Sequence, residues 1–382
     1  MQVIRDEYKF SEVYTPPRLP HREKEVELLV NTMRASYGLN EGLYLIKGEP
    51  GIGKTSVARL SSKKLEGLIK DFRVVHVNCR IYRTPTSVIQ KILSAIHPGI
   101  PNRGLSLQEL MSILEDALKN ERNLLVILDE LDYLREGEDL VYSLLRSHEG
   151  IMGNPLTLLL IARWEPPYLM EPSIRSFMNM RISLQKYTRE QLASIVKYRA
   201  EDALYEGTFD DEIISMIAEF TEHSGNARIA IRMLYLAAKF AESRNMSRIT
   251  PELVREAASS VGVVGIDNEM LSALDIHDKV ILLAVSRALS SSSKAWIKMG
   301  DLVEEYTLAC EELGIQPYKY TAVWKRVREL RKIGLLETKK SKEGVRGQTT
   351  LVSLGSIPAE KMAKRIEEIL EEELSPLPQK LR

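Results

Sequence analysis

The stretch Gly48-Glu49-Pro50-Gly51-Ile52-Gly53-Lys54-Thr55 has the residue types and spacing of a phosphate-binding loop. Its glycines let successive backbone N–H groups converge on an anion, and a helix starting after them adds its positive end. Lys54 can reach the β- and γ-phosphates, and the Thr55 hydroxyl can bind Mg²⁺. The sequence therefore predicts a site for ATP or ADP with Mg²⁺. Its predicted nucleotide-binding residues are Gly48, Pro50, Gly51, Ile52, Gly53, Lys54, Thr55 and Ser56.

The residues on either side supply the strand and the helix that such a loop requires. The apolar run 43–46 precedes the loop, and residues 56–60 begin a helical pattern directly after it. A chance glycine turn is the alternative. Strand, glycine-rich turn and helix in that order favour the phosphate-binding loop.

Two adjacent carboxylates, Asp129 and Glu130, end a run of five apolar residues at 124–128. A buried parallel strand whose carboxyl end meets a ligand has this pattern. Asp129 would hold Mg²⁺ through its water shell, and Glu130 would orient and polarise the attacking water. Any buried strand can also end in an acid that caps a helix. The phosphate-binding loop upstream favours the catalytic interpretation.

The apolar runs of the first half are expected to form one sheet. Strands are predicted at 43–46, 73–78, 124–128, 156–162 and 180–184, with helices at 81–96 and from the capping box Ser106–Glu109 onward. Strands that alternate with helices indicate a doubly wound α/β domain, here residues 1–184. Its ligand should lie at the carboxyl ends of the strands.

Only helical patterns follow, and they predict an all-helical lid at residues 185–265. Its helices are expected at 188–204, 211–222, 227–244 and 251–259. Gly225 suits a break between two of them, and Arg228 then lies in the first turn of the next helix. A solvated surface charge is the more common fate of a single arginine. The place of Arg228 after a phosphate-loop domain favours a role at the nucleotide over that of a solvated charge.

The last third predicts a winged helix-turn-helix at residues 266–356, followed by a C-terminal helical tail at 357–382. Three helices (272–288, 300–313 and 318–333) precede two strands (335–340 and 348–354) that are joined by a glycine-containing tip. On the third helix, one face is apolar and the opposite face is basic. The apolar face carries Val323, Val327 and Leu330, and the opposite face carries Thr321, Lys325, Arg328 and Lys332.

Positive charge is concentrated in this module. The whole chain is neutral, with 53 basic and 53 acidic residues, but residues 318–347 contain ten basic and three acidic ones. Such clustering is typical of a surface that binds nucleic-acid phosphates. Winged helices that only contact proteins are the alternative. The predicted DNA-binding residues are Thr321, Lys325 and Arg328 at base edges, and Lys332, Lys340, Lys342 and Arg346 at phosphates.

Composition excludes several other classes of protein. Cys79 and Cys310 are the only cysteines and are far apart, so the sequence predicts neither a disulfide framework nor a cysteine–metal cluster. The first twenty residues lack an apolar signal segment, and the apolar runs are too short to span a bilayer. We expect a cytoplasmic, nucleoid-associated protein without a membrane partner.

These motifs together resemble an AAA+ ATPase, and in particular the archaeal origin-recognition and cell-division-cycle type of replication initiator. The resemblance covers nearly the whole chain and includes Leu19-Pro20-His21-Arg22-Glu23, Gly225-Asn226-Ala227-Arg228 and the extra helix after the second strand. It implies that His21 and Arg22 help to frame the adenine. It also implies that Arg228 is the second sensor and that Arg175 is an arginine finger.

One position departs from the family pattern. Arg163 stands at the end of the fourth strand, where the family usually has a small polar residue that positions the hydrolytic water. A guanidinium is a poor substitute for that amide, although it can contact phosphate. We therefore expect nucleotide binding with slow hydrolysis, so that the nucleotide acts mainly as a switch.

The resemblance implies an ATP-dependent DNA replication initiator. Such a protein binds origin duplex DNA through its winged helix and AAA+ core and helps to recruit the replicative helicase, with related initiator paralogues as further partners. A switch-type signalling ATPase whose winged helix serves transcriptional control or protein contacts is the alternative. An assembly ATPase of the clamp-loader kind, without DNA specificity of its own, is a third possibility.

Overall fold

The computed structural model describes residues 2–36, 42–97, 99, 104–119, 123–147, 155–261, 271–272, 274–291, 294–340, 349–354 and 357–374. The chain divides into two compact units. Unit 1 comprises Met1–Ser11, Leu192–Ser224 and Ile229–Arg382, and unit 2 comprises Glu12–Gln191 and Gly225–Arg228.

The centre of unit 2 is a five-stranded parallel sheet in the order β2-β3-β4-β1-β5. The strands are β1 (Leu43–Lys47), β2 (Phe72–Asn78), β3 (Asn123–Asp129), β4 (Leu156–Ala162) and β5 (Met178–Ser183). All five predicted strands are present, and the predicted doubly wound α/β fold is confirmed. Asp129 is the last residue of β3, as expected for a ligand-facing carboxylate.

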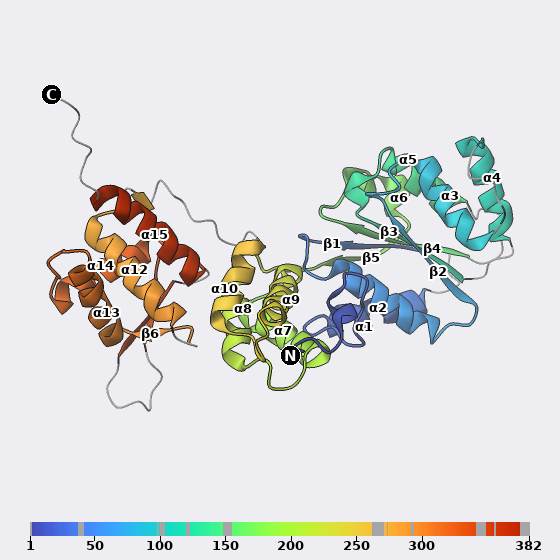
Figure 1. Cartoon of the computed structure of the whole chain (residues 1–382). Coiled ribbons are helices and arrows are strands. Elements are labelled where there is room, and N and C mark those ends of the chain that lie inside the picture. The colour runs from blue at the N-terminus through green and yellow to red at the C-terminus, as the bar shows by residue number, and fades with distance from the viewer. Residues whose placement is uncertain are drawn as a thin grey trace, which may run out of the picture. The chain divides into compact units, whose positions relative to one another are not determined.

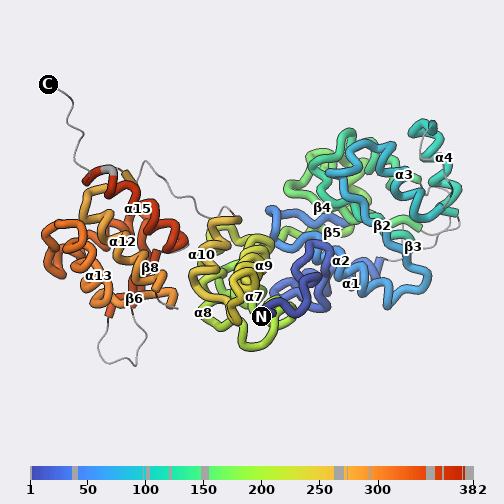
Figure 2. Tube along the Cα trace, in the orientation of Figure 1, coloured from blue at the N-terminus to red at the C-terminus, as the bar shows by residue number. Residues whose placement is uncertain are grey.

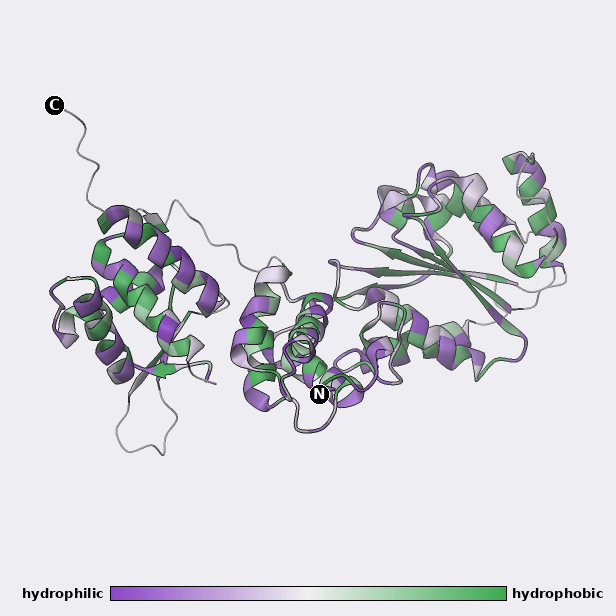
Figure 3. Cartoon of the chain, in the orientation of Figure 1, coloured by the Kyte–Doolittle hydropathy of each residue, from purple (hydrophilic) through white to green (hydrophobic). Residues whose placement is uncertain are grey.

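Helices cover both faces of this sheet (Figure 1). The helices α1 (Glu23–Ala35) and α2 (Lys54–Glu66) lie on one face, and α3 (Pro85–Ile96), α4 (Leu107–Leu118) and α5 (Gly137–Arg146) lie on the other. The strands between them are strongly hydrophobic (Figure 3), because parallel strands are covered on both sides. Short helices complete the unit at η2 (Leu131–Tyr133), η3 (Pro167–Met170) and α6 (Pro172–Arg175).

The helix predicted at 81–96 begins later than expected. Pro85 is the first residue of α3, and the Thr84 side chain caps it by accepting the backbone N–H of Ser87 at 3.3 Å. A proline is favoured at the first helical position because its missing N–H has no partner there in any case. The predicted capping box of the next helix is confirmed, since Ser106 and Glu109 bond each other's backbone N–H groups.

The lid helices of unit 1 are α7 (Arg189–Ala203), α8 (Asp211–Thr221), α9 (Ala227–Ser243) and α10 (Pro251–Ser260), so all four predicted helices are present. The N-terminal residues, including η1 (Glu7–Phe10), pack on these helices (Figure 2). Ile4 forms a β-bridge with Leu204, and the N–H groups of Val3 and Ile4 both donate to Glu242 at 3.0 Å. The predicted core range 1–184 therefore includes a segment that belongs with the lid.

The winged-helix part of unit 1 contains α12 (Ile276–Ser290), α13 (Met299–Glu312) and α14 (Tyr320–Lys332). Its sheet has three strands in the order β6-β8-β7, namely β6 (Ile297–Lys298), β7 (Glu337–Lys340) and β8 (Thr350–Ser353). The sequence predicted a two-stranded ribbon, and the structure adds β6 as a third strand. β6 was missed because two residues are too few to show an alternating pattern.

The predicted C-terminal tail contains helix α15 (Ala359–Leu374). Its apolar residues Met362, Ile366 and Leu370 are buried in the same hydrophobic cluster as Val323 and Val327 of α14. α15 therefore contributes to the core of the winged-helix part. Among the described residues, every helix is too short or too polar to cross a membrane.

Candidate nucleotide-binding site and DNA-binding surface

The phosphate-binding loop connects β1 to α2, in the predicted order. Gly51 has a φ of +77° and packs against Asn226, so that a Cβ atom at Gly51 would lie 1.9 Å from Asn226 Oδ1. Only glycine fits both this backbone conformation and this close approach. The backbone N–H of Arg228 also lies 3.4 Å from the Gly51 carbonyl oxygen. The Gly225–Arg228 segment is therefore in direct contact with the loop.

The first turn of α2 is available to an anion. Gly53, with a φ of +97°, is its N-cap, and a glycine has no side chain with which to cap the helix. The backbone N–H groups of a helix start need an acceptor, and phosphate oxygens can supply it. The loop thus fits the polyphosphate that its sequence predicts.

Lys54 already lies along the loop. Its Nζ donates to the carbonyl oxygens of Gly48 (2.6 Å) and Glu49 (2.8 Å). Burial lowers the pKa of Lys54; Asp129 and Asp132 oppose this shift, while Arg228 and Arg163 add to it. A bound polyphosphate would supply the negative charge that these cations require.

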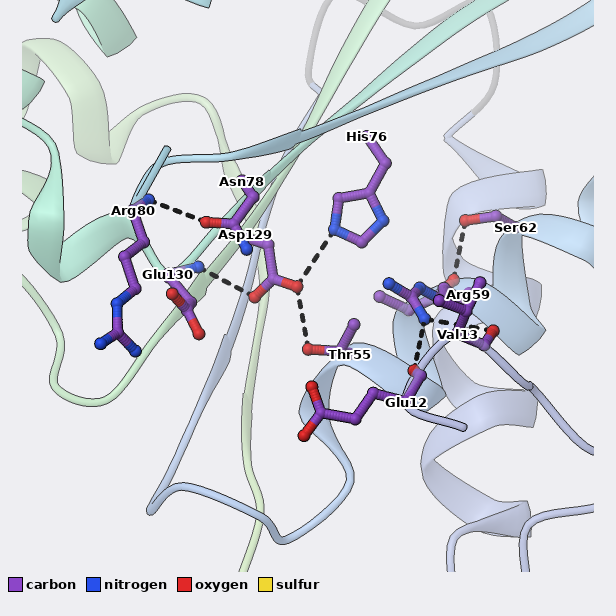
Figure 4. A network of polar contacts seen from close by, with 11 residues as sticks. Glu12, Val13, Thr55, Arg59, Ser62, His76, Asn78, Arg80, Asp129 and Glu130 are labelled. Carbon is purple, nitrogen blue, oxygen red and sulfur yellow. Dashed lines mark hydrogen bonds and ion pairs between the residues drawn. The ribbon is translucent and has the colours of Figure 1, made fainter. Parts of the chain in front are cut away.

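Asp129 and Thr55 are brought together as the magnesium prediction requires (Figure 4). The Thr55 hydroxyl donates to Asp129 Oδ2 at 2.8 Å, and the backbone N–H of Glu130 donates to Oδ1 at 2.8 Å. Burial opposes the ionisation of Asp129, but hydrogen bonds from His76, Thr55 and the Glu130 backbone outweigh it and hold the pKa below its usual value. A buried carboxylate beside a hydroxyl fits Mg²⁺, which prefers oxygen ligands.

Glu130 occupies a strained position with an unused acceptor. Its φ of +55° is rare for a residue with a side chain, and such conformations cluster at functional sites. Its Oε2 atom is buried and accepts no hydrogen bond within the described part of the chain. A buried carboxylate oxygen normally has a donor, so this atom fits a water molecule or a hydroxyl group.

Arg163 lies on an ordered turn after β4. The carboxylate of Asp132 accepts the backbone N–H groups of Arg163 (2.7 Å) and Trp164 (3.4 Å). Asp132 cannot be identified from the sequence, because its partners lie some thirty residues further along the chain. Arg228 is exposed, and its Nε lies 3.6 Å from Glu12 Oε1, so only a weak surface ion pair holds it.

The two residues of the pre-loop motif have different environments. Arg22 is buried, and its guanidinium donates to the Ile52 carbonyl (3.4 Å), the Tyr187 hydroxyl (3.0 Å) and the Gln185 carbonyl (2.5 Å). Arg22 therefore stabilises the phosphate-binding loop through its hydrogen bond to the Ile52 carbonyl. His21 is exposed with a φ of +65° in the turn before α1. Its predicted contact with adenine stays a prediction.

Arg175 is exposed at the end of α6. An exposed arginine can reach the nucleotide of a neighbouring molecule, which is the role of an arginine finger supplied in trans. That role also stays a prediction.

The predicted DNA-binding face of α14 is exposed. Val323, Val327 and Leu330 are buried, while the opposite stripe, namely Thr321, Lys325, Arg328 and Lys332, is exposed, as is Lys340 at the end of β7. Lys342 and Arg346 lie outside the described residues. The guanidinium of Arg326 pairs with Asp275 (3.1 Å) and Asp278 (2.9 Å), so two carboxylates already balance its charge.

Comparison with known proteins finds the same organisation along the chain. Residues 38–162 match the AAA domain, residues 193–259 match the Cdc6 AAA+ ATPase-type lid domain, and residues 269–364 match the Cdc6 C-terminal winged helix domain. One relative is ORC1-type DNA replication protein 2 of Saccharolobus solfataricus, which is 32% identical over 94% of this chain and 92% of its own length.

Solved structures give the same result. Cdc6p from Pyrobaculum aerophilum superimposes with a TM-score of 0.81 at 30% identity, over 97% of this chain and 100% of that chain. The Aeropyrum pernix ORC1 protein in complex with DNA has a TM-score of 0.62 at 27% identity, over 97% of both chains. The Aeropyrum pernix ORC2 protein in ADPNP–ADP complexes has a TM-score of 0.62 at 26% identity, over 98% of this chain and 100% of that chain.

A phosphate-binding loop after β1, an Asp–Glu pair at the end of β3 and a lid segment on the loop define an AAA+ ATPase. Within that class, the chain belongs to the family of ORC1/Cdc6-type DNA replication proteins. The family resemblance and the fold predicted from the sequence are thereby confirmed.

Proposed function

We propose that the protein is an ATP-dependent replication initiator that binds origin duplex DNA. The family assignment supports this function, and so does the ORC1 relative, which was solved in complex with DNA. The observation that supports the proposal most is the exposed stripe on α14, because winged helices that bind DNA place such a helix, with basic side chains on one face, in the major groove.

The nucleotide is ATP or ADP with Mg²⁺, held by the loop and the end of β3. When bound, Mg²⁺ supplies charge neutralisation at the β- and γ-phosphate oxygens. The backbone N–H groups of the loop and Lys54 bind the phosphates. Thr55 provides an oxygen atom for the ion, Asp129 holds the ion through its water shell, and Glu130 accepts a hydrogen bond from the attacking water and orients it.

Hydrolysis is slow in this proposal. Arg163 carries a positive charge where a small amide would position the water, and the charge acts on the same region as Lys54 and Arg228. Three cations favour retention of a polyphosphate and of ADP after cleavage. The protein therefore works mainly as a switch between nucleotide states.

Several partners follow from the family rather than from this chain's geometry. We infer that the AAA+ core adds a second DNA contact, that related initiator paralogues share the origin, and that the replicative helicase is recruited there. The protein would then act on the chromosome in the cytoplasm. A signalling ATPase whose winged helix only contacts proteins is the competing function, and the DNA measurements that follow separate the two.

Substitutions on α14 and at the end of β7 are expected to separate base contacts from phosphate contacts. Arg328→Ala should cost about 1–3 kcal/mol on the preferred sequence and relax discrimination, because the Arg328 side chain lies on the exposed face of the helix that would meet base edges. Lys340→Ala should weaken binding to all sequences alike and reduce the salt slope by about one unit. Fluorescence anisotropy with specific and random duplexes, over a salt titration, measures both effects.

The matched control is Lys364→Ala, which removes one exposed positive charge from α15. It should leave the affinity for both duplexes unchanged. Equal losses in all three variants would mean that only net charge matters. Wild-type affinity in both Arg328→Ala and Lys340→Ala would show that the winged helix does not bind DNA.

A further inference from the structure

His76 contacts the carboxylate of Asp129, although nothing in the phosphate-loop motif calls for a histidine at this place. His76 is on β2, which pairs with β3 in parallel register, and Asn78 lies opposite Asp129. The His76 Nε2 atom is 3.0 Å from Asp129 Oδ2 (Figure 4). The side chain of His76 is 24% exposed and that of Asp129 is 6% exposed, so the contact is largely shielded from solvent.

The contact completes a set of three donors around one carboxylate. Asp129 Oδ2 accepts from the Thr55 hydroxyl and from His76, and Oδ1 accepts from the backbone N–H of Glu130. A carboxylate is an acceptor only, so the hydrogen atom of the His76 contact belongs to Nε2. The carboxylate plane is thereby fixed from both oxygens. With about four lone-pair directions on a carboxylate, room is left for a metal-bound water.

We propose that His76 is a positioning residue for the magnesium site: it orients Asp129 by a hydrogen bond and does not itself bind the ion. The inference rests on the proposed use of Mg²⁺ at Thr55 and Asp129. Replacing hydrogen-bond partners in the outer shell of a metal site typically lowers metal affinity by about 10–100-fold. Keeping the imidazole outside the first coordination shell leaves only oxygen ligands, which favours Mg²⁺ over softer ions that bind imidazole well.

The test compares two replacements of His76 in the full-length protein. His76→Leu fills similar space without a donor, and His76→Gln retains an N–H group at comparable reach. The affinity for fluorescent ADP is measured in excess Mg²⁺ and in EDTA, and the affinity for Mn²⁺ with ADP present is measured by EPR. His97→Leu makes the same change at an exposed histidine of the same unit and serves as the control.

We expect His76→Leu to weaken Mn²⁺ binding by about 10–100-fold and to remove most of the tightening of ADP by Mg²⁺. Its ADP affinity in EDTA should stay within about twofold of the wild type. A purely structural role would instead lower the affinity in both conditions. His76→Gln should recover most of the metal dependence, and His97→Leu should behave as the wild type does.

Two results would contradict the inference. One is a Mn²⁺ affinity of His76→Leu equal to that of the wild type, provided that the wild type binds ADP more tightly with Mg²⁺ than in EDTA. The other is a directly bonded ¹⁴N coupling in pulsed EPR of the wild-type Mn²⁺ complex, lost in His76→Leu, which would make His76 a ligand. If ADP binding by the wild type is the same with Mg²⁺ and with EDTA, the proposed magnesium site itself is wrong.

Discussion

Glu130→Gln is expected to reduce ATP hydrolysis by about 10²–10⁴-fold, the usual contribution of a positioned general base. Glutamine has nearly the same shape but cannot accept a proton, so the fold and the nucleotide affinity should be unchanged. The buried, unpaired Oε2 atom gives the physical reason, because it is a free acceptor at the end of β3. Single-turnover hydrolysis of radiolabelled ATP is the suitable measurement, since slow turnover is expected from the wild type.

The control is Glu136→Gln in the same connection between β3 and α5. Glu136 has nearly the same backbone conformation, with a φ of +51° against +55° at Glu130, and its side chain is exposed. It should hydrolyse ATP at the wild-type rate. Equal losses in the two variants would assign the effect to backbone strain. A loss in Arg163→Ala as large as that in Glu130→Gln would contradict the assignment of the catalytic base.

Lys54→Ala is expected to weaken ATP binding by about 100-fold or more. Each hydrogen bond from a charged donor is worth about 1.5–3 kcal/mol, and the ammonium would give at least two of these to phosphate oxygens. In the structure, the same ammonium donates to carbonyl oxygens of its own loop. The fold should survive, because Lys54 is the first residue of α2 and alanine is a good helix former.

Isothermal titration calorimetry with ATP measures this loss, and Lys63→Ala is the control. Lys63 is an exposed lysine on the same helix, and its removal changes the net charge by the same amount. It should bind ATP as the wild type does. Equal ATP affinity in Lys54→Ala and the wild type would overturn the assignment of the phosphate-binding loop.

The parts of the fold that could be predicted are those whose pattern is local and long. β4 has the predicted bounds because its seven consecutive residues are almost all apolar, the pattern of a short strand buried on both faces. The helix predicted at 81–96 begins at Pro85 in the structure. The prediction began too early because it followed the apolar periodicity and did not include the N-cap at Thr84. β6 could not be predicted, because its two residues are held by pairing with Val352 and Leu351, more than fifty residues away.

The residues of the candidate site also divide into those that local sequence identifies and those that it does not. Lys54, Thr55, Asp129 and Glu130 could be identified because the motifs fix their residue types at set distances from a strand. His76 and Asn226 could not, because each acts through a contact that only the folded sheet and the lid segment create. The pairing of Arg326 with Asp275 and Asp278 is equally non-local, so the count of ten basic residues at 318–347 includes one whose charge is already balanced within the protein.

We propose above all that this chain binds duplex DNA at replication origins. The most direct measurement is to map the genomic DNA that co-purifies with the wild-type protein and with Arg328→Ala. We predict enrichment at replication origins with the wild type, and loss of that enrichment in Arg328→Ala. Enrichment at promoters, or a uniform genomic background for both proteins, would contradict the claim.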